Sequence, residues 1–233
     1  MHWVIKNLKE GQIVIHSHKS KNEARLWAPA TPDYLLSSLK EDRGLYEVLS
    51  HYPYKVYFDI DHDAAPDPEF LNKIKTIIDE YFPDGDFAIS GSVTPDKTSY
   101  HFVSNHYFIE SKEDRDTLQT ICKYLRENVE YAFDPNPYSD NRFMKCVNQS
   151  KAEDNPKDKR VQQVIEQDNL KKHLITCYMR NDYYPMPEFE EPQHEEVNLE
   201  INIIKAKKPL NLGSLPVITS VSGKTPLMHA SKG

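Results

Sequence analysis

Two segments alternate apolar and polar residues so regularly that they constrain the fold more than any other feature. Residues 54–61 read YKVYFDID, and residues 99–108 read SYHFVSNHYF. Such alternation is typical of strands with one face on a core and the other face free. Each segment is followed by a stretch with apolar residues at helical spacing. The sequence therefore predicts two strands that each lead into a helix.

Both predicted helices carry clear start signals. Asp67 is suited to an N-cap, with Pro68 and Glu69 in the first turn. Ser111 and Asp114 have the spacing of a capping box. The apolar residues expected to face the core are Phe70, Leu71, Ile74, Ile77, Ile78 and Tyr81 in the first helix, and Leu118, Ile121, Cys122, Leu125 and Val129 in the second. Pro83 to Gly85 end the first helix.

Shorter segments complete the pattern. We expect a strand at 87–90, a loop at 92–97 and a last strand at 143–147, after the turn that begins at Asp134. The order is then β-α-β-β-α-β, which places two helices on one face of an antiparallel sheet. The other face is left for a site. The sequence predicts an α+β fold with this core at residues 51–155.

The first fifty residues are predicted to form an accessory α/β layer. We expect a hairpin from residues 2–5 and 12–16, and a helix that opens at Pro32. The apolar spacing at 45–49 continues the helical pattern. A further helix is expected near 169–178, which would end a catalytic domain of residues 1–180.

Charge is distributed unevenly along the chain. The net charge is −7, and residues 181–200 alone hold seven acids without Lys or Arg. Residues 181–233 therefore read as an acidic linker and C-terminal tail, whose order the sequence leaves open. Residues 142–172 carry eight Lys or Arg against five acids. Such a segment suits either a polyanion or plain solvent.

Several classes of protein do not fit this chain. No stretch approaches the roughly 20 apolar residues of a membrane span, and the first ten residues reach charge too early for a signal peptide. The three cysteines are far apart, so no zinc is expected. We expect a soluble intracellular protein of the cytoplasm or nucleus, without membrane partners.

Asp59 and Asp61 are the first candidates for chemistry. Residues two apart on a strand share a face, so their Cα atoms lie roughly 6.5 Å apart and both carboxylates can bind the same cations. Unpaired carboxylates at the end of an apolar strand are costly without a cation. The alternative is an ordinary solvated strand end.

Two further clusters carry phosphate-binding chemistry. Ser99 and His101 also share a strand face, and Ser92 and Lys97 precede them in a loop suited to a triphosphate. The second cluster joins one acid to a basic stretch, and comprises Asp134, Arg142, Lys145 and Lys151. A structural histidine and a charged edge strand are the plain alternatives. Together the clusters indicate nucleotidyl transfer with two divalent metals.

These motifs resemble the archaeo-eukaryotic primase superfamily, within its primase-polymerase branch, which includes the primase domains of poxvirus-type and other large DNA-virus primase-helicases. The matching segments are YFDID, KTSYHF and DPNPYSDNRFMKCVNQSK, within about residues 50–155. The chain has Asp61 where cellular relatives commonly have Glu. It also has Phe143 in place of a polar residue, and Lys145 in place of Arg.

The resemblance implies a set of roles and partners. Metal ligation and catalysis fall to Asp59, Asp61 and Asp134. Nucleotide contacts fall to Ser92, Lys97, Ser99, His101, Arg142, Lys145 and Lys151. It also implies an RRM-like catalytic fold and a two-metal site for Mg²⁺ or Mn²⁺. The implied partners are a single-stranded DNA template, nucleoside triphosphates and a separately encoded replicative helicase, at the replication site of the host if the chain is viral.

Two other functions remain open. FDID also resembles the nucleophile motif of haloacid dehalogenase-type phosphatases, with Asp59 as nucleophile and Asp61 as acid/base. The departures at Phe143 and Lys145 also fit a degenerate primase module that binds nucleic acid without catalysis.

Overall fold

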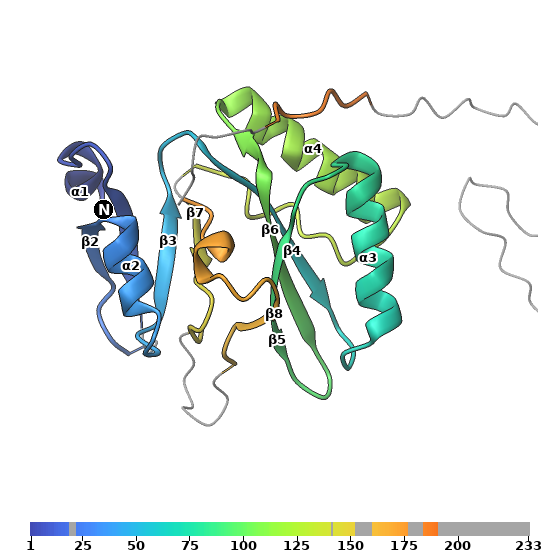
Figure 1. The fold of residues 1–233 in the computed structure, drawn as a ribbon, viewed down its shortest axis with the longest axis horizontal. Coiled ribbons are helices and arrows are strands. Elements are labelled where there is room, and N and C mark those ends of the chain that lie inside the picture. The colour runs from blue at the N-terminus through green and yellow to red at the C-terminus, as the bar shows by residue number, and fades with distance from the viewer. Residues whose placement is uncertain (19–21, 141, 152–159, 177–183, 191–233) are drawn as a thin grey trace, which may run out of the picture. The chain divides into compact units, whose positions relative to one another are not determined.

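The computed structural model describes residues 1–18, 22–140, 142–151, 160–176 and 184–190. They form an α+β fold with two antiparallel sheets and a few helices, as the α+β part of the predicted fold class expects (Figure 1). One compact unit spans Met1–Glu191. The rest of the expected tail, 191–233, lies outside the described residues.

The sheet that carries the two alternating segments has the strand order β4-β6-β5-β8. Its strands are β4 (Tyr54–His62), β5 (Ala88–Val93), β6 (Thr98–Ile109) and β8 (Gln163–Glu166). Figure 1 shows α3 (Pro68–Tyr81) and α4 (Lys112–Asn128) on one side of this sheet and the other sheet on its opposite side. The polar face of the first sheet therefore looks toward the second sheet.

Both helices begin as their sequence predicts. The Asp67 carboxylate accepts the Glu69 backbone N–H at 2.9 Å, and Ser111 forms a full capping box with Asp114. The helices bury apolar side chains against the rings of Phe58 and Phe102. Each fully buried side chain of this size stabilises the fold by roughly 1.5–3 kcal/mol. Val129, expected on the buried face of the second helix, is 43% exposed.

The second sheet has the order β2-β1-β3-β7. Its strands are β1 (Ile13–Ser17), β2 (Leu26–Ala30), β3 (Leu45–Leu49) and β7 (Arg142–Lys145). The helix α2 (Pro32–Ser38) opens at Pro32 as expected, and its Leu35 packs with Ile15 and Leu45. The helix α1 (His2–Lys6) contributes Val4 to a separate cluster with Val14 and Val48.

Three predicted elements have a different secondary structure. Residues 2–5 form a helix rather than a strand of a hairpin, and residues 45–49 form a strand rather than a helix. The spacing of Leu45, Val48 and Leu49 fits a helix, but β3 lies between β1 and β7 and is buried on both faces. The helix expected at 169–178 is reduced to a 3₁₀ turn, η2 (Leu170–His173).

The last predicted strand forms but joins the other sheet. Its residues pair with β3, with Val48 opposite Phe143, and not with β4. The edge of β4 is instead covered by the turn around Asp134, whose backbone N–H donates to the Asp59 carbonyl at 2.9 Å. Ile60 forms a bridge to Phe133 in the same turn. The single β-α-β-β-α-β sheet is therefore corrected to two separate sheets, with β7 in the second one.

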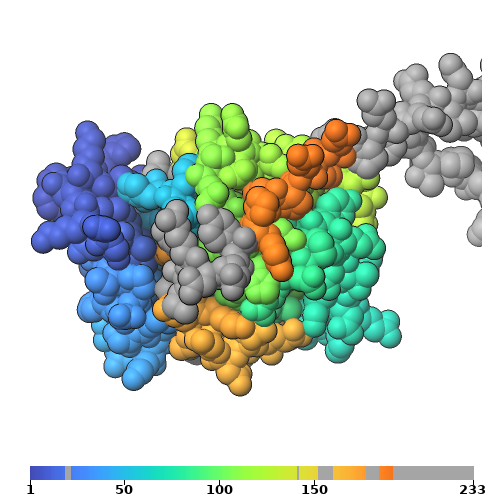
Figure 2. Space-filling model, turned by 45° about the horizontal axis from the view of Figure 1, so that its top comes forward, coloured from blue at the N-terminus to red at the C-terminus, as the bar shows by residue number. Residues whose placement is uncertain are grey.

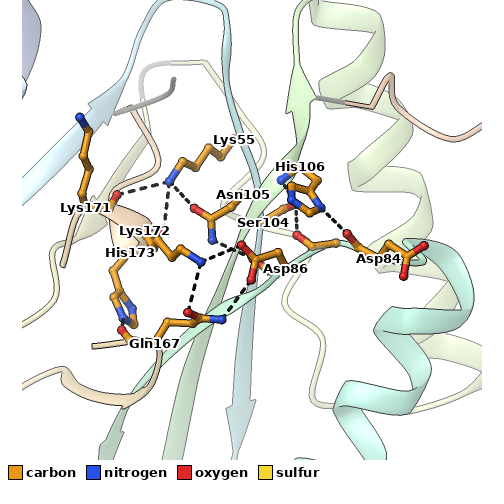
Figure 3. A network of polar contacts seen from close by, with 11 residues as sticks. Lys55, Asp84, Asp86, Ser104, Asn105, His106, Gln167, Lys171, Lys172 and His173 are labelled. Carbon is orange, nitrogen blue, oxygen red and sulfur yellow. Dashed lines mark hydrogen bonds and ion pairs between the residues drawn. The ribbon is translucent and has the colours of Figure 1, made fainter. Parts of the chain in front are cut away.

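A partly buried polar network ties η2 to the first sheet (Figure 3). The Lys55 ammonium donates to Asn105 Oδ1 at 2.8 Å and to the carbonyls of Lys171 and Lys172 at 3.3 and 3.0 Å. The Asp86 carboxylate accepts from Lys172 at 2.9 Å. The network fixes the segment that follows β8.

Residues 184–190 pack onto the body of the unit. Phe189 contacts Tyr81 of α3 and Tyr124 of α4, with ring centroids 6.1 and 5.6 Å apart. Figure 2 shows this segment in orange between the surfaces of the two helices. Across the described ranges, no helix has the length and apolar character needed to cross a bilayer.

Candidate functional site

The site begins with the pairing of β4 and β6. Asp59 lies opposite His101 and Asp61 lies opposite Ser99. Ser92 of β5 lies opposite Ser99 on the other side. Because directly paired residues share a face of a sheet, all five side chains leave the same face. Two-residue spacing predicts the shared faces within each strand, and the register brings the two strands' pairs together.

This face borders a cavity of about 220 Å³ between the two sheets. The second sheet contributes Tyr46 from β3 and Phe143, Met144 and Lys145 from β7. The other lining residues are Asp59, Asp61, Ser92, Lys97, Ser99, His101, Lys151 and Arg160. Eight of the ten residues singled out in the sequence therefore meet in one place.

Asp134 and Arg142 are the two predicted residues that do not line the cavity. The Asp134 carboxylate accepts hydrogen bonds from the Asn136 backbone at 3.0 Å and side chain at 2.6 Å, and lies 3.7 Å from Arg126 Nη1. Arg142 is exposed and donates to Ser139 Oγ at 2.6 Å. Metal ligation by Asp134 and nucleotide binding by Arg142 stay predictions.

Asp59 is the most perturbed acid of the site. Burial raises the pKa of its carboxyl group to about 7, and the negative charges of Asp61 and Asp134 act in the same direction. Lys145 and Lys97 oppose the rise. No hydrogen bond to this carboxylate comes from the part of the chain that the structure describes. The charge of Asp134 therefore affects the pKa of Asp59, although the Asp134 carboxylate forms its hydrogen bonds with Asn136.

His101 and Lys145 are perturbed in the opposite sense. Burial lowers the pKa of His101 to about 3, with Lys145 adding to the effect, so the imidazole is neutral at pH 7. Its Nε2 lies 3.7 Å from Asp59 Oδ1, and this contact is not an ion pair. Burial also lowers the pKa of Lys145 to about 8, and Asp59 limits that fall. Lys97 pairs with Asp61 at 3.2 Å.

The acids of the cavity fit a divalent cation in part. A buried carboxylate beside a second carboxylate on the same face is favoured by a cation that both can bind, and carboxylate oxygens suit Mg²⁺ and Mn²⁺. Among the described residues, however, no three His, Cys, Asp or Glu side chains gather as ligands. Asp59 and Asp61 would therefore supply the protein oxygens that bind the cation. Phosphate or water oxygens would supply its remaining ligands.

Four residues that line the cavity are not among the predicted ligand contacts: Tyr46, Phe143, Met144 and Arg160. Arg160 belongs to the basic stretch 142–172, which was the signal that could have found it. Tyr46 lies in a segment whose spacing predicts a helix, so the sequence gives no signal that places this residue at the cavity. Phe143 was noticed only as a departure from the family pattern.

Comparisons with known proteins add no assignment. No protein-family model matches the chain, and a search of curated proteins finds no match.

Proposed function

We propose that the chain is a metal-dependent nucleotidyltransferase, a primase-polymerase that extends primers on a single-stranded DNA template. The strand order β4-β6-β5, with α3 after β4 and α4 after β6 on one face, supports an RRM-like core. The fourth position beside β4 is taken by the turn at Asp134, which departs from a regular RRM-like sheet.

One observation carries the proposal. A pair of carboxylates and a group of cations line a single cavity, with Asp59 and Asp61 on one strand and Lys97, Lys145 and Arg160 from three other segments. A triphosphate with bound divalent metal presents both charges that such a cavity complements. Lys97 pairs with Asp61 at 3.2 Å, whereas among the described residues no Lys or Arg forms an ion pair with Asp59, and burial disfavours its negative charge.

The residues divide the work of nucleotidyl transfer. Asp59 and Asp61 would hold Mg²⁺ or Mn²⁺, which would supply charge stabilisation for the attacking and leaving oxygens. Lys97, Lys145, Lys151 and Arg160 neutralise the triphosphate and the departing pyrophosphate. The neutral imidazole of His101 can donate one hydrogen bond to a phosphate oxygen, and burial maintains that protonation state.

The two other functions are weighed on the same residues. A haloacid dehalogenase-type phosphatase needs alternating parallel βα units, whereas the named strands of the described residues pair in antiparallel fashion. A degenerate module that binds nucleic acid without catalysis is favoured by the position of the Asp134 carboxylate, which contacts Asn136 and Arg126. It is the stronger rival.

Primer extension tests the proposal. The assay supplies a primed single-stranded DNA template, nucleoside triphosphates of either sugar and Mn²⁺ or Mg²⁺. We expect wild type to extend the primer and the Asp59→Asn, Asp61→Asn double variant to lose at least 100-fold in rate, about 2.7 kcal/mol. Asparagine keeps the side-chain shape, so folding is preserved.

The matched control is Asp79→Asn with Glu80→Gln. Both carboxylates are exposed on α3, which packs on the opposite face of the sheet, and the double variant also removes two negative charges. It should extend primers like wild type. Equal extension by the cavity variant and wild type would overturn catalysis at this site. Template binding without any extension would favour the degenerate module.

A further inference from the structure

Two aromatic rings form one wall of the cavity. Tyr46 of β3 and Phe143 of β7 line it together with the carboxylates and cations. Both side chains are half-buried, and neither belongs to the three apolar clusters of the core. We call Tyr46 and Phe143 the aromatic wall. Half-buried rings that line a cavity can contact a ligand inside it.

The wall is held from behind by further rings. His16 of β1 lies opposite Tyr46, and Trp27 of β2 lies opposite His16. The His16 ring centroid is 5.3 Å from that of Tyr46, 5.2 Å from that of Phe143 and 4.3 Å from that of Trp27. Packed rings of this kind lose little further freedom when a ligand stacks on them.

The wall adjoins charged residues in a way that suits one chemistry. Lys145 lies opposite Tyr46 in the β3–β7 pairing, on the same face of the sheet as Phe143. A flat ring beside cations and a carboxylate pair complements a flat base attached to phosphates. A lipid headgroup or a free phosphate would bind to the cations but would have no flat group to stack on the rings.

We propose that the aromatic wall binds a nucleobase by stacking, with Phe143 as the main platform. This inference rests on the proposed function, because it assigns a part of the same ligand. The base can come from a nucleoside triphosphate, whose phosphates then reach Lys145 and Lys151, or from an unpaired position of the template strand. Stacking recognises the π-face that every base has, so the wall binds all four bases.

Two binding comparisons separate the sources. In the first, calorimetry measures ATP against inorganic tripolyphosphate in the presence of Mg²⁺. In the second, fluorescence anisotropy measures a labelled oligothymidylate against an oligomer of equal length with abasic sugars. The variants are Phe143→Leu, which keeps apolar bulk, and Phe143→Trp, which keeps a ring. Trp3→Leu is the control, because it removes an exposed ring (73% exposed) in α1, which is not among the lining elements.

We expect Phe143→Leu to weaken binding of the base-containing ligand about tenfold in one of the two comparisons. Binding of the base-free analogue should stay unchanged. Phe143→Trp should bind as wild type or more tightly, and Trp3→Leu as wild type. The inference is overturned if Phe143→Leu weakens binding of neither base-containing ligand. It is also overturned if the variant weakens binding of each base-free analogue as much as binding of its base-containing counterpart. Primer extension by the Asp59, Asp61 double variant reports separately on the proposed function, since selective loss of base binding can occur whether or not catalysis does.

Discussion

Asp59 and His101 face each other across β4 and β6, with 3.7 Å between Oδ1 and Nε2, and burial shifts both pKa values toward the neutral forms. The pair therefore does not stabilise itself as an ion pair at pH 7. With Asp61 two residues along the same strand, the carboxylate of Asp59 is favoured by a bound cation instead.

The first prediction concerns metal binding without any nucleotide. Saturating Mn²⁺ should raise the melting temperature of wild type by roughly 5 °C, because a ligand that binds only the folded state stabilises it. The Asp59→Asn, Asp61→Asn variant should show no such rise by scanning calorimetry, whereas the Asp79→Asn, Glu80→Gln control should. An equal rise in all three proteins would place the cation elsewhere.

The second prediction concerns His16 and acid. His16 is buried, and among the described residues neither of its ring nitrogens has a hydrogen-bond partner. Burial lowers its pKa from 6.5 to about 4, and the positive charges of Arg25 and His18 add to this. The unfolded chain therefore takes up the proton first, and the free energy of unfolding falls as pH drops from 6.5 toward 4.

The His16 contribution to this loss is about 2 kcal/mol. His16→Phe preserves a ring against Trp27 and should remove that part, while His101 and His173, whose pKa values are also lowered, keep theirs. Urea unfolding of wild type and His16→Phe at pH 7 and pH 4.5 measures how much the free energy of unfolding of each protein changes with pH. The same pH dependence in both proteins would contradict the account of His16.

The third prediction concerns Glu47, a buried acid of β3. Its carboxylate accepts the backbone N–H groups of Ile175 and Thr176 at 3.0 and 2.7 Å, and the Thr176 hydroxyl at 2.6 Å. Glu47→Gln places an amide donor against these donors, so it should destabilise the protein by about 2 kcal/mol in urea unfolding. Glu10→Gln, at an exposed position, should change little. Similar stabilities would mean that the carboxylate is dispensable.

The fourth prediction concerns Lys55 and the segment that follows β8 (Figure 3). Lys55→Met leaves Asn105 Oδ1 and two carbonyls of η2 without this donor, at a cost of about 2–3 kcal/mol. Hydrogen exchange should rise most in residues 163–173, which the network ties to the sheet. Lys9→Met serves as the exposed control. If exchange rises equally in α4, the network does not act locally.

Much of the first sheet could be predicted from sequence. The alternation around Asp59 and His101 fixes both strand faces, and the caps at Asp67 and Ser111 locate both helices. These signals are local: each depends on residues within one element or one turn. The shared face of Asp59 and Asp61 follows from the same periodicity.

The second sheet could not be predicted in this way. The spacing of Leu45, Val48 and Leu49 fits a helix, and only the partner strands far along the chain decide otherwise. The same long-range pairing brings Tyr46 and Phe143 to the cavity. Nor does the sequence around Asp134 reveal that its backbone would cover the edge of β4 while its carboxylate binds Asn136.

The central claim is that Asp59 and Asp61 hold divalent metal against a nucleoside triphosphate. Anomalous scattering from crystals grown with Mn²⁺ and a nucleoside triphosphate that cannot be cleaved between its α- and β-phosphates tests it most directly. We predict Mn²⁺ bound by oxygens of both Asp59 and Asp61, with the phosphates beside Lys97 and Lys145. A nucleotide bound away from this cavity, or Mn²⁺ that contacts neither carboxylate, would contradict the account.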